Sequence, residues 1–114
     1  MADRRESFDR LLAIWGGSVP VEELDCLVAP GYVGHVGSRD RSLAQLKIDI
    51  AAYRAATPAV FRAQHQISEG DYLATRLTAQ LIGAASVCGM NISRWENELL
   101  AEEWAVWESF NVAG

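Results

Sequence analysis

The sequence predicts an α+β domain, in which N-terminal helices pack on a curved, mainly antiparallel sheet. Two observations predict this fold class. Up to residue 57 the apolar residues recur at the spacing of helix faces, and from Val60 onward they follow the alternation and turn signals of strands. Helices that precede a meander of strands are typical of an α+β domain. Because 114 residues leave room for one hydrophobic core, we expect residues 1–114 to form a single domain.

The first two predicted helices have clear boundaries. The first ends at Gly16-Gly17, and its apolar face has side chains at i, i+3, i+4 and i+7, namely Phe8, Leu11, Leu12 and Trp15. The second begins at Pro20, a residue suited to the first turn of a helix. We expect Pro30-Gly31 to stop it, so that residues 32–37 form a short extended segment that carries His35.

The third predicted helix begins at Ser42, which together with Gln45 fits a capping box. Its apolar face includes Tyr53, and Thr57-Pro58 ends it, because the residue before a proline avoids the helical region. No helical stripe follows. The remaining chain reads as four strands with turns between them, at residues 60–69, 72–82, 86–95 and 99–110.

The last two strands predict a pocket wall. Side chains alternate between the faces of a strand, so one face carries Leu100, Glu102, Trp104, Val106 and Glu108. A three-residue connection at 96–98 adds Cys88, Met90, Ile92 and Arg94 to that face. We expect this even-numbered face to line the pocket, because an apolar wall with a few charges is typical of a small-molecule site. A one-residue slip or a bulge would reverse the two faces.

Composition disfavours several partners. Fifteen acidic against ten basic residues give a formal charge of −5, which argues against nucleic acid, since binding to phosphates depends on clustered Lys and Arg. We expect a cytoplasmic protein that does not enter membranes, because there is neither a signal peptide nor a run of 18 apolar residues. We expect no metal, because Cys26, Cys88, His35 and His65 lack the spacing of metal ligands.

Three ordered motifs add a family resemblance. They are P-x-Y-V-x-H at residues 30–35, E-G-D at 69–71, and R-[FW]-x-x-x-x-[IL]-x-E-x-W at 94–104. With them the sequence resembles the SnoaL-like polyketide cyclases of the nuclear transport factor 2-like superfamily. The resemblance implies a cone-shaped α+β barrel with an internal pocket, and a homodimer formed through the outer sheet face. It also implies an enzyme that needs no cofactor and closes a ring by an intramolecular aldol reaction.

The resemblance also assigns candidate catalytic residues. Glu108 matches the carboxylate that serves as acid and base, which is usually an aspartate. Arg94 matches the basic residue of the preceding strand, and His35 matches the histidine of the first motif. Each has a plainer interpretation. Glu108 could be a solvated charge at a strand end, Arg94 an ion-pair partner of Glu102, and His35 a hydrogen-bonded packing residue.

The expected substrate is a small apolar carbonyl compound of the polyketide type. The side chains that we expect to contact it are Trp15, Tyr53, Met90, Glu102 and Trp104. Trp107, on the opposite face beside Ala101 and Ala105, is expected to lie in the dimer interface. Besides glutamate in place of aspartate at 108, two features depart from the family pattern: Glu98 stands where a glycine is usual, and the segment 78–88 is shorter. A module that binds a ligand or dimerises without chemistry is therefore the alternative function.

Overall fold

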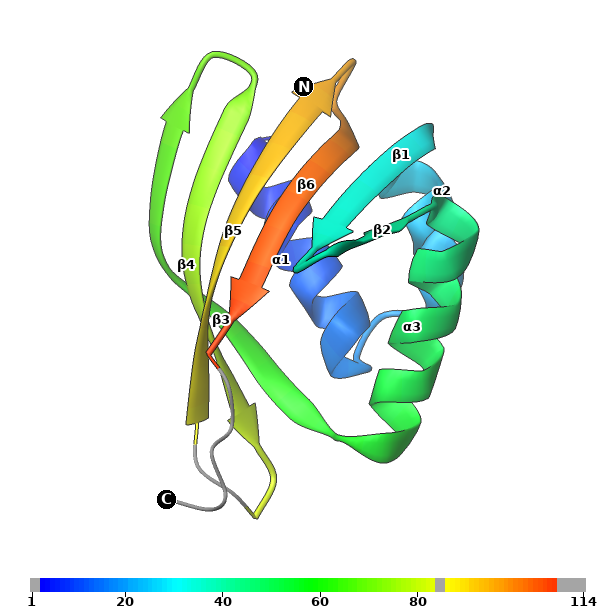
Figure 1. The fold of residues 1–114 in the computed structure, drawn as a ribbon, viewed down its shortest axis with the longest axis vertical. Coiled ribbons are helices and arrows are strands. Elements are labelled where there is room, and N and C mark those ends of the chain that lie inside the picture. The colour runs from blue at the N-terminus through cyan, green and yellow to red at the C-terminus, as the bar shows by residue number, and fades with distance from the viewer. Residues whose placement is uncertain (1–2, 84–85, 109–114) are drawn as a thin grey trace.

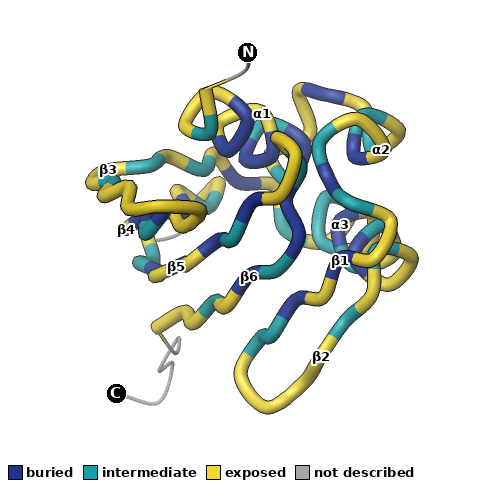
Figure 2. Tube along the Cα trace, turned by 90° about the horizontal axis from the view of Figure 1, so that it is seen from above, coloured by how far each residue is buried: buried dark blue, intermediate teal, exposed yellow. Residues whose placement is uncertain are grey.

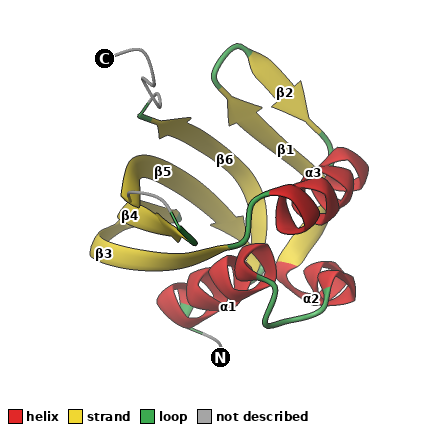
Figure 3. Ribbon diagram, turned by 90° about the horizontal axis from the view of Figure 1, so that it is seen from below, coloured by secondary structure: helices red, strands yellow, loops and turns green. Residues whose placement is uncertain are grey.

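The computed structural model describes residues 3–83 and 86–108. Over these ranges, helices lie on one side of a curved six-stranded sheet (Figures 1 and 3). The helices are α1 (Arg4–Gly16), the 3₁₀ turn η1 (Val21–Glu23), α2 (Leu24–Leu27) and α3 (Leu43–Ala56). The strands are β1 (Val28–Val36), β2 (Arg39–Arg41), β3 (Ala59–Glu69), β4 (Tyr72–Leu81), β5 (Ser86–Glu96) and β6 (Leu99–Trp107).

The sheet has the strand order β2-β1-β6-β5-β4-β3. All neighbouring strands run antiparallel except β1 and β6, which run parallel. This parallel pair joins the segment that follows the N-terminal helices to the end of the meander. The predicted α+β fold, with helices on a curved and mainly antiparallel sheet, is confirmed.

Local capping explains where α1 and α3 begin and end, and the end of α1 and the start of α3 lie where they were predicted. The Asp3 side chain accepts a hydrogen bond from the Arg5 N–H at 2.8 Å, and Ser42 accepts one from the Gln45 N–H at 3.2 Å. Gly17 ends α1 with φ of 91°, a left-handed conformation that glycine adopts without steric cost. These caps are properties of short sequence segments, so the sequence alone could predict them.

The predicted second helix is wrong in its extent. The chain forms the turn η1 and the four-residue helix α2, and strand β1 begins at Val28, before Pro30-Gly31. The ladder between β1 and β6 shifts register between Val28 and Val33, and this irregularity contains the proline. Proline cannot donate to a regular ladder, so it is accommodated at the bulge rather than at a helix end.

The core lies between the helices and the inner face of the sheet. Figure 2 shows buried residues alternating with more exposed ones along much of β5. The helices and strands contribute fully or almost fully buried side chains to one cluster, among them Phe8, Leu11, Ile14, Leu24, Leu46, Ile50, Leu73, Leu77, Trp95 and Leu100. This core holds the helices against one face only and leaves the opposite face of the sheet uncovered within the described chain.

The β5–β6 hairpin is tighter than predicted. Glu96 pairs with Leu99, so the loop has two residues, Asn97 and Glu98, with φ of 51° and 67°. Two positive φ angles in succession are typical of a type I′ turn, which favours asparagine and glycine. The register of the β5–β6 ladder then shifts between Trp95 and Arg94, so that Arg94 pairs with Glu102. The expected three-residue connection at 96–98 is therefore wrong.

The predicted grouping of side chains on one face holds for Ile92, Arg94, Glu102 and Trp104, but the direction of that face is wrong, and Leu100, predicted on the same face, lies in the core instead. Cross-strand pairing places Arg94 beside Glu102 and Ile92 beside Trp104, whereas the expected connection would have paired Arg94 with Leu100 and Ile92 with Glu102. These even-numbered residues lie on the outer face, whereas the odd-numbered face, with Glu103 buried, points toward the helices. Small residues on the inner face, such as Gly89, Ser93 and Ala105, suit the concave side of a strongly curved sheet, where bulky neighbours would crowd.

Candidate functional site

The inner face of the sheet and the helices enclose a cavity of about 380 Å³. Its wall is mainly apolar and aromatic, with Phe8, Leu11, Leu12, Trp15, Tyr53, Phe61, Leu77 and Trp107 among the lining residues. Four lining residues are strongly polar: Arg41, Asn91, Glu103 and Glu108. An apolar cavity with a few convergent polar groups is the usual form of a small-molecule site.

Aromatic rings pack along one wall of this cavity. Trp15 meets Tyr53 edge-to-face with ring centroids 5.8 Å apart, and Phe61 meets Trp107 in the same way at 6.0 Å. A Cβ atom on Gly89 would come within 2.7 Å of the Trp107 indole, so this indole lies directly on the glycine. Burial raises the pKa of the Tyr53 hydroxyl above its usual value. The wall is therefore apolar and offers ring faces and edges to a flat ligand.

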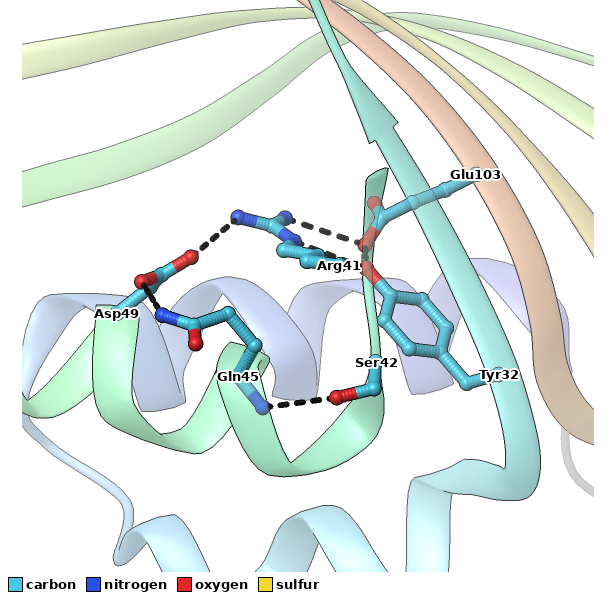
Figure 4. A network of polar contacts seen from close by, with 6 residues as sticks. All are labelled: Tyr32, Arg41, Ser42, Gln45, Asp49 and Glu103. Atoms are coloured by element: carbon cyan, nitrogen blue, oxygen red, sulfur yellow. Dashed lines mark hydrogen bonds and ion pairs between the residues drawn. The ribbon is translucent and has the colours of Figure 1, made fainter. Parts of the chain in front are cut away.

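A buried polar network closes one end of the cavity, centred on Glu103, which is 3% exposed. The Tyr32 hydroxyl donates to Glu103 Oε2, and Asn91 Nδ2 donates to Glu103 Oε1 at 2.8 Å. A guanidinium nitrogen of Arg41 lies 3.5 Å from Oε2 (Figure 4). Donors from three other strands thus hold one carboxylate, which meets the requirement that a buried charge be paired and hydrogen-bonded.

Arg41 connects this carboxylate to helix α3. Its Nε donates to the Tyr32 hydroxyl at 3.2 Å, and another of its nitrogens lies 3.6 Å from Asp49 Oδ2 (Figure 4). The guanidinium carbon is also 5.4 Å from the centroid of the Trp15 ring, within cation–π range. Burial opposes the charge on Arg41, but contacts with Tyr32, Glu103 and Asp49 outweigh it and raise the pKa of the guanidinium.

Two further features keep the network in place. Burial, followed by the negative charge of Glu103, raises the pKa of Tyr32, so its hydroxyl remains a donor. Gly34 of β1 pairs with Glu103 of β6 on one side and with Arg41 of β2 on the other. A Cβ atom at Gly34 would collide with the Tyr32 hydroxyl and come within 3.0 Å of Arg41 Nε. Glycine at this position therefore leaves the room that both side chains occupy.

The predicted catalytic residue Glu108 lines the cavity at its exposed end. Its Oε1 accepts a hydrogen bond from the Cys88 N–H at 2.8 Å, and its own N–H donates to the Cys88 carbonyl at 3.0 Å. Glu108 thus extends the β5–β6 ladder by one residue while its side chain turns back to β5. The predicted strand end at residues 109–110, and positions 84–85 of the shortened segment, lie outside the described residues.

Three predicted ligand contacts also line the cavity, namely Trp15, Tyr53 and Met90. The other predicted site residues do not. His35, Arg94, Glu102 and Trp104 lie together on the outer face, and we call these four residues the outer cluster. The expectation that they share a cavity with Glu108 is wrong, because the odd-numbered side chains of β6 face inward. Glu108 is the residue after the end of β6, and it lines the cavity because its side chain turns back to the Cys88 N–H of β5.

The outer cluster is held by hydrogen bonds and stacking. Glu102 bonds His35 Nε2 at 2.7 Å and Arg94 Nε at 3.3 Å, so the anticipated ion pair of Arg94 with Glu102 is confirmed. The His35 ring stacks on Trp104 with centroids 5.3 Å apart. Hydrogen bonds that His35 donates to Glu102 and then to Asp40 raise the pKa of His35, and the bond from His35 lowers the pKa of Glu102. These contacts are typical of a surface ion network.

The residues at the buried end of the cavity were not predicted: Tyr32, Arg41, Asn91 and Glu103. One signal could have found part of this set. Glu103 lies between Ala101 and Ala105 on alternate positions, and Asn91 lies between Gly89 and Ser93 in the same way. Polar residues that alternate with the smallest side chains indicate a crowded inner face, where each polar group needs a partner.

Solved structures share this fold. Wild-type IdmH from Streptomyces antibioticus superposes with a TM-score of 0.79 at 19% identity, covering 94% of this chain and 93% of its own. A SnoaL-like polyketide cyclase from Agrobacterium tumefaciens strain C58 gives 0.79 at 16% identity, covering 96% and 94%. A loop-truncation variant of IdmH gives 0.82 at 20% identity, with 93% of both chains covered.

The chain has the fold of the SnoaL-like polyketide cyclases. No family model matches the sequence, and neither does any curated protein. A designed protein with a curved β-sheet superposes equally well, with a TM-score of 0.80 at 9% identity over 95% of this chain and 88% of its own. The SnoaL-like fold is therefore reached by very different sequences, and function has to be argued from the site.

Two further observations concern the described chain, residues 3–83 and 86–108. It contains no group of three or more His, Cys, Asp and Glu side chains that could hold a metal ion. None of its helices is long and apolar enough to cross a membrane.

Two adjacent glutamates on β6 allow a matched test of the buried network. Glu103→Gln is expected to lower the free energy of unfolding by about 2–4 kcal/mol, because it removes one partner of a buried ion pair. Glu102→Gln, on the outer face, is expected to cost at most about 1 kcal/mol, since its partners are partly exposed. Urea unfolding monitored by circular dichroism measures both. Equal losses for the two variants would contradict the network.

Proposed function

We propose that this protein is a cofactor-independent acid/base enzyme that cyclises or isomerises a small apolar carbonyl compound. The observation that carries the proposal is the position of Glu108 at the exposed end of the aromatic cavity. One carboxylate oxygen is held by the Cys88 N–H, and no partner of the other oxygen is found among the described residues. A carboxylate that is oriented but still has a free oxygen is suited to proton transfer.

Glu108 suits this role better than Glu103, the other carboxylate that lines the cavity. Both oxygens of Glu103 already accept hydrogen bonds, from Tyr32 and Asn91, and Arg41 lies beside one of them. Protonating Glu103 during a reaction would break contacts that hold three strands. Glu108 can take up and release a proton without disturbing the buried core.

The proposed reaction needs only this proton shuttle and a fixed substrate. Glu108 removes a proton from the carbon next to a carbonyl, which leaves an enolate. In a cyclisation the enolate carbon attacks a second carbonyl of the same molecule, a C–C bond forms, and Glu108 returns the proton to the new alkoxide. In an isomerisation the substrate is a β,γ-unsaturated carbonyl compound: the double bond moves into conjugation with the carbonyl as Glu108 returns the proton to the γ-carbon. The apolar wall supports both routes, because it excludes water and holds the bound substrate in a folded conformation.

The two ends of the cavity have different parts in this scheme. Glu108 lies five residues beyond Glu103 along β6, which corresponds to about 16 Å at the rise of a strand. A group at Glu108 and a group at the buried network therefore contact different parts of one ligand. We assign proton transfer to the exposed end and recognition of the ligand to the buried end.

A binding module without chemistry is the second candidate function. It is favoured by the exposure of Glu108 and by the backbone hydrogen bond from Cys88, which would also suit a carboxylate that merely ends a strand. The cavity would then bind an apolar ligand, and no residue would transfer protons.

Hydrogen–deuterium exchange distinguishes the two candidates. We expect the protein to accelerate exchange at the carbon next to the carbonyl of 1-tetralone in D₂O, followed by proton NMR. Glu108→Gln keeps the shape of the side chain and is expected to slow the catalysed exchange by roughly 100-fold, the effect of losing a general base. Glu98→Gln, in the β5–β6 turn, serves as the matched control and should leave the rate unchanged.

Two outcomes would contradict the assignment. If the Glu108→Gln protein is folded and exchanges at the full rate, Glu108 is not the base. If the unchanged protein binds 1-tetralone but does not accelerate exchange, the binding module is the better interpretation.

We also propose that two copies of the chain associate through the outer face. Strand pairing aligns Ile67, Ala74, Ile92 and Trp104 in one row across β3, β4, β5 and β6. Three of these side chains are large and exposed, and Val106 and Tyr72 are exposed beside them. Contiguous apolar surface of this kind favours association. Trp107, which we expected in this interface, lies in the cavity instead, and Trp104 takes its place.

Light scattering after gel filtration tests the association. We expect the mass of a dimer for the unchanged protein and of a monomer for Trp104→Glu, because a charge at the centre of the row opposes burial. Ile48→Glu, at an exposed position of helix α3, is the control and should remain a dimer. A monomer mass for the unchanged protein at high concentration would refute the proposal.

A further inference from the structure

The buried end of the cavity contains an acceptor that no described residue satisfies. Asn91 lines the cavity and is 6% exposed, and its Oδ1 is buried without a hydrogen-bond partner among the described residues. Buried side-chain oxygens usually have a partner, so one that lacks it calls for an explanation. Because Asn91 lies in the wall of a cavity, a bound molecule can supply the missing donor.

The orientation of the Asn91 amide is fixed by its neighbour. Glu103 Oε1 lies 2.8 Å from Asn91 Nδ2, and a carboxylate in contact with Tyr32 and Arg41 accepts hydrogen bonds. If the amide were turned over, two oxygens would face each other. The amide nitrogen must therefore face Glu103, and the atom without a partner is the amide oxygen, which accepts a hydrogen bond rather than donating one.

The charges around the cavity determine a second property of the ligand. Arg41 is the one cationic side chain among the described lining residues, and Glu103 and Glu108 are the lining carboxylates. Arg41 is already flanked by Glu103 at 3.5 Å and by Asp49 at 3.6 Å. Arg41 is thus shared between two carboxylates, and Glu108 adds a negative charge at the other end of the cavity, so a negatively charged ligand would meet repulsion without a free cation to offset it.

We infer that Asn91 is a specificity-determining residue, which accepts a hydrogen bond from a hydroxyl or N–H group of an apolar ligand that carries no negative charge. The inference rests on the proposed function, because it describes the ligand of the same cavity. It adds the chemistry at the end of the ligand remote from Glu108. A hydroxyl donor satisfies Asn91 Oδ1, whereas a methoxy group at the same position brings a second acceptor to it.

A matched series of ligands tests the inference by binding alone. The compounds are 7-hydroxy-1-tetralone, 7-methoxy-1-tetralone and the 7-carboxylate, titrated at pH 7 by calorimetry. We expect the hydroxy compound to bind about 10-fold more tightly than the methoxy compound, the effect of one buried hydrogen bond. The carboxylate is expected to bind more weakly than either. Since no turnover is required, failure of the exchange experiment leaves this result intact.

Two variants assign the preference to residues. Asn91→Leu is expected to bind the hydroxy and methoxy compounds equally, because the acceptor is gone. Glu108→Gln, at the exposed end, removes one negative charge without entering the buried network. We expect it to tighten binding of the carboxylate by about threefold or more and to leave the preference for hydroxy over methoxy unchanged.

Several outcomes would overturn the inference. These are equal binding of the hydroxy and methoxy compounds by the unchanged protein, tightest binding of the carboxylate, and no binding of any of the three. If Asn91→Leu does not fold, the ligand series with the unchanged protein and with Glu108→Gln still decides the matter. A folded Asn91→Leu protein that retains the full preference would show that another residue accepts the hydrogen bond.

Discussion

The buried carboxylate of Glu103 is the constraint on which the site depends. It lies on β6, and its partners come from β1, β2 and β5, so one side chain connects four of the six strands. Through Arg41 and Asp49 the connection extends to helix α3 (Figure 4). A buried charge is tolerated only when such partners surround it. The same partners form the polar end of the cavity, so stability and ligand recognition depend on the same atoms.

Curvature of the sheet explains why the two faces of β5 and β6 differ so much. On the concave side the residues are small or engaged with neighbours, and Gly89 leaves space for the indole of Trp107. On the convex side, large side chains spread apart and meet solvent, as Trp104 and Ile92 do. Two tryptophans three positions apart thus have different surroundings, one in the cavity wall and one in the outer cluster.

The sequence predicts the fold well because the fold depends on local signals. The cap at Ser42, the glycine end of α1 and the alternation within the strands all act over a few residues. The face that points inward depends instead on a two-residue turn with Glu98 at φ of 67° and on a register shift beside Arg94. Neither the turn nor the register shift can be recognised in the sequence. Glutamate is unusual at positive φ, and a register shift does not change the alternation of apolar and polar residues along a strand.

The candidate site was predicted only in part for the same reason. Trp15 and Tyr53 come from two helix faces, whose positions follow from local pattern, and Glu108 was assigned from the family resemblance. His35 and Arg94 were assigned to the cavity from family motifs, but strand parity puts them outside. Arg41 belongs to a three-residue strand that has no recognisable sequence pattern. Its contact with Glu103 therefore could not be predicted without the folded structure.

The central claim is that the odd-numbered face of β6 forms the ligand cavity. It can be tested most directly by fluorine NMR of protein labelled with 5-fluorotryptophan, with each of the four signals assigned by replacing one tryptophan with phenylalanine. Addition of 7-hydroxy-1-tetralone is expected to shift the signals of Trp15 and Trp107, which line the cavity, and to leave those of Trp95 and Trp104 in place. A shift of the Trp104 signal with Trp107 unchanged would contradict the account.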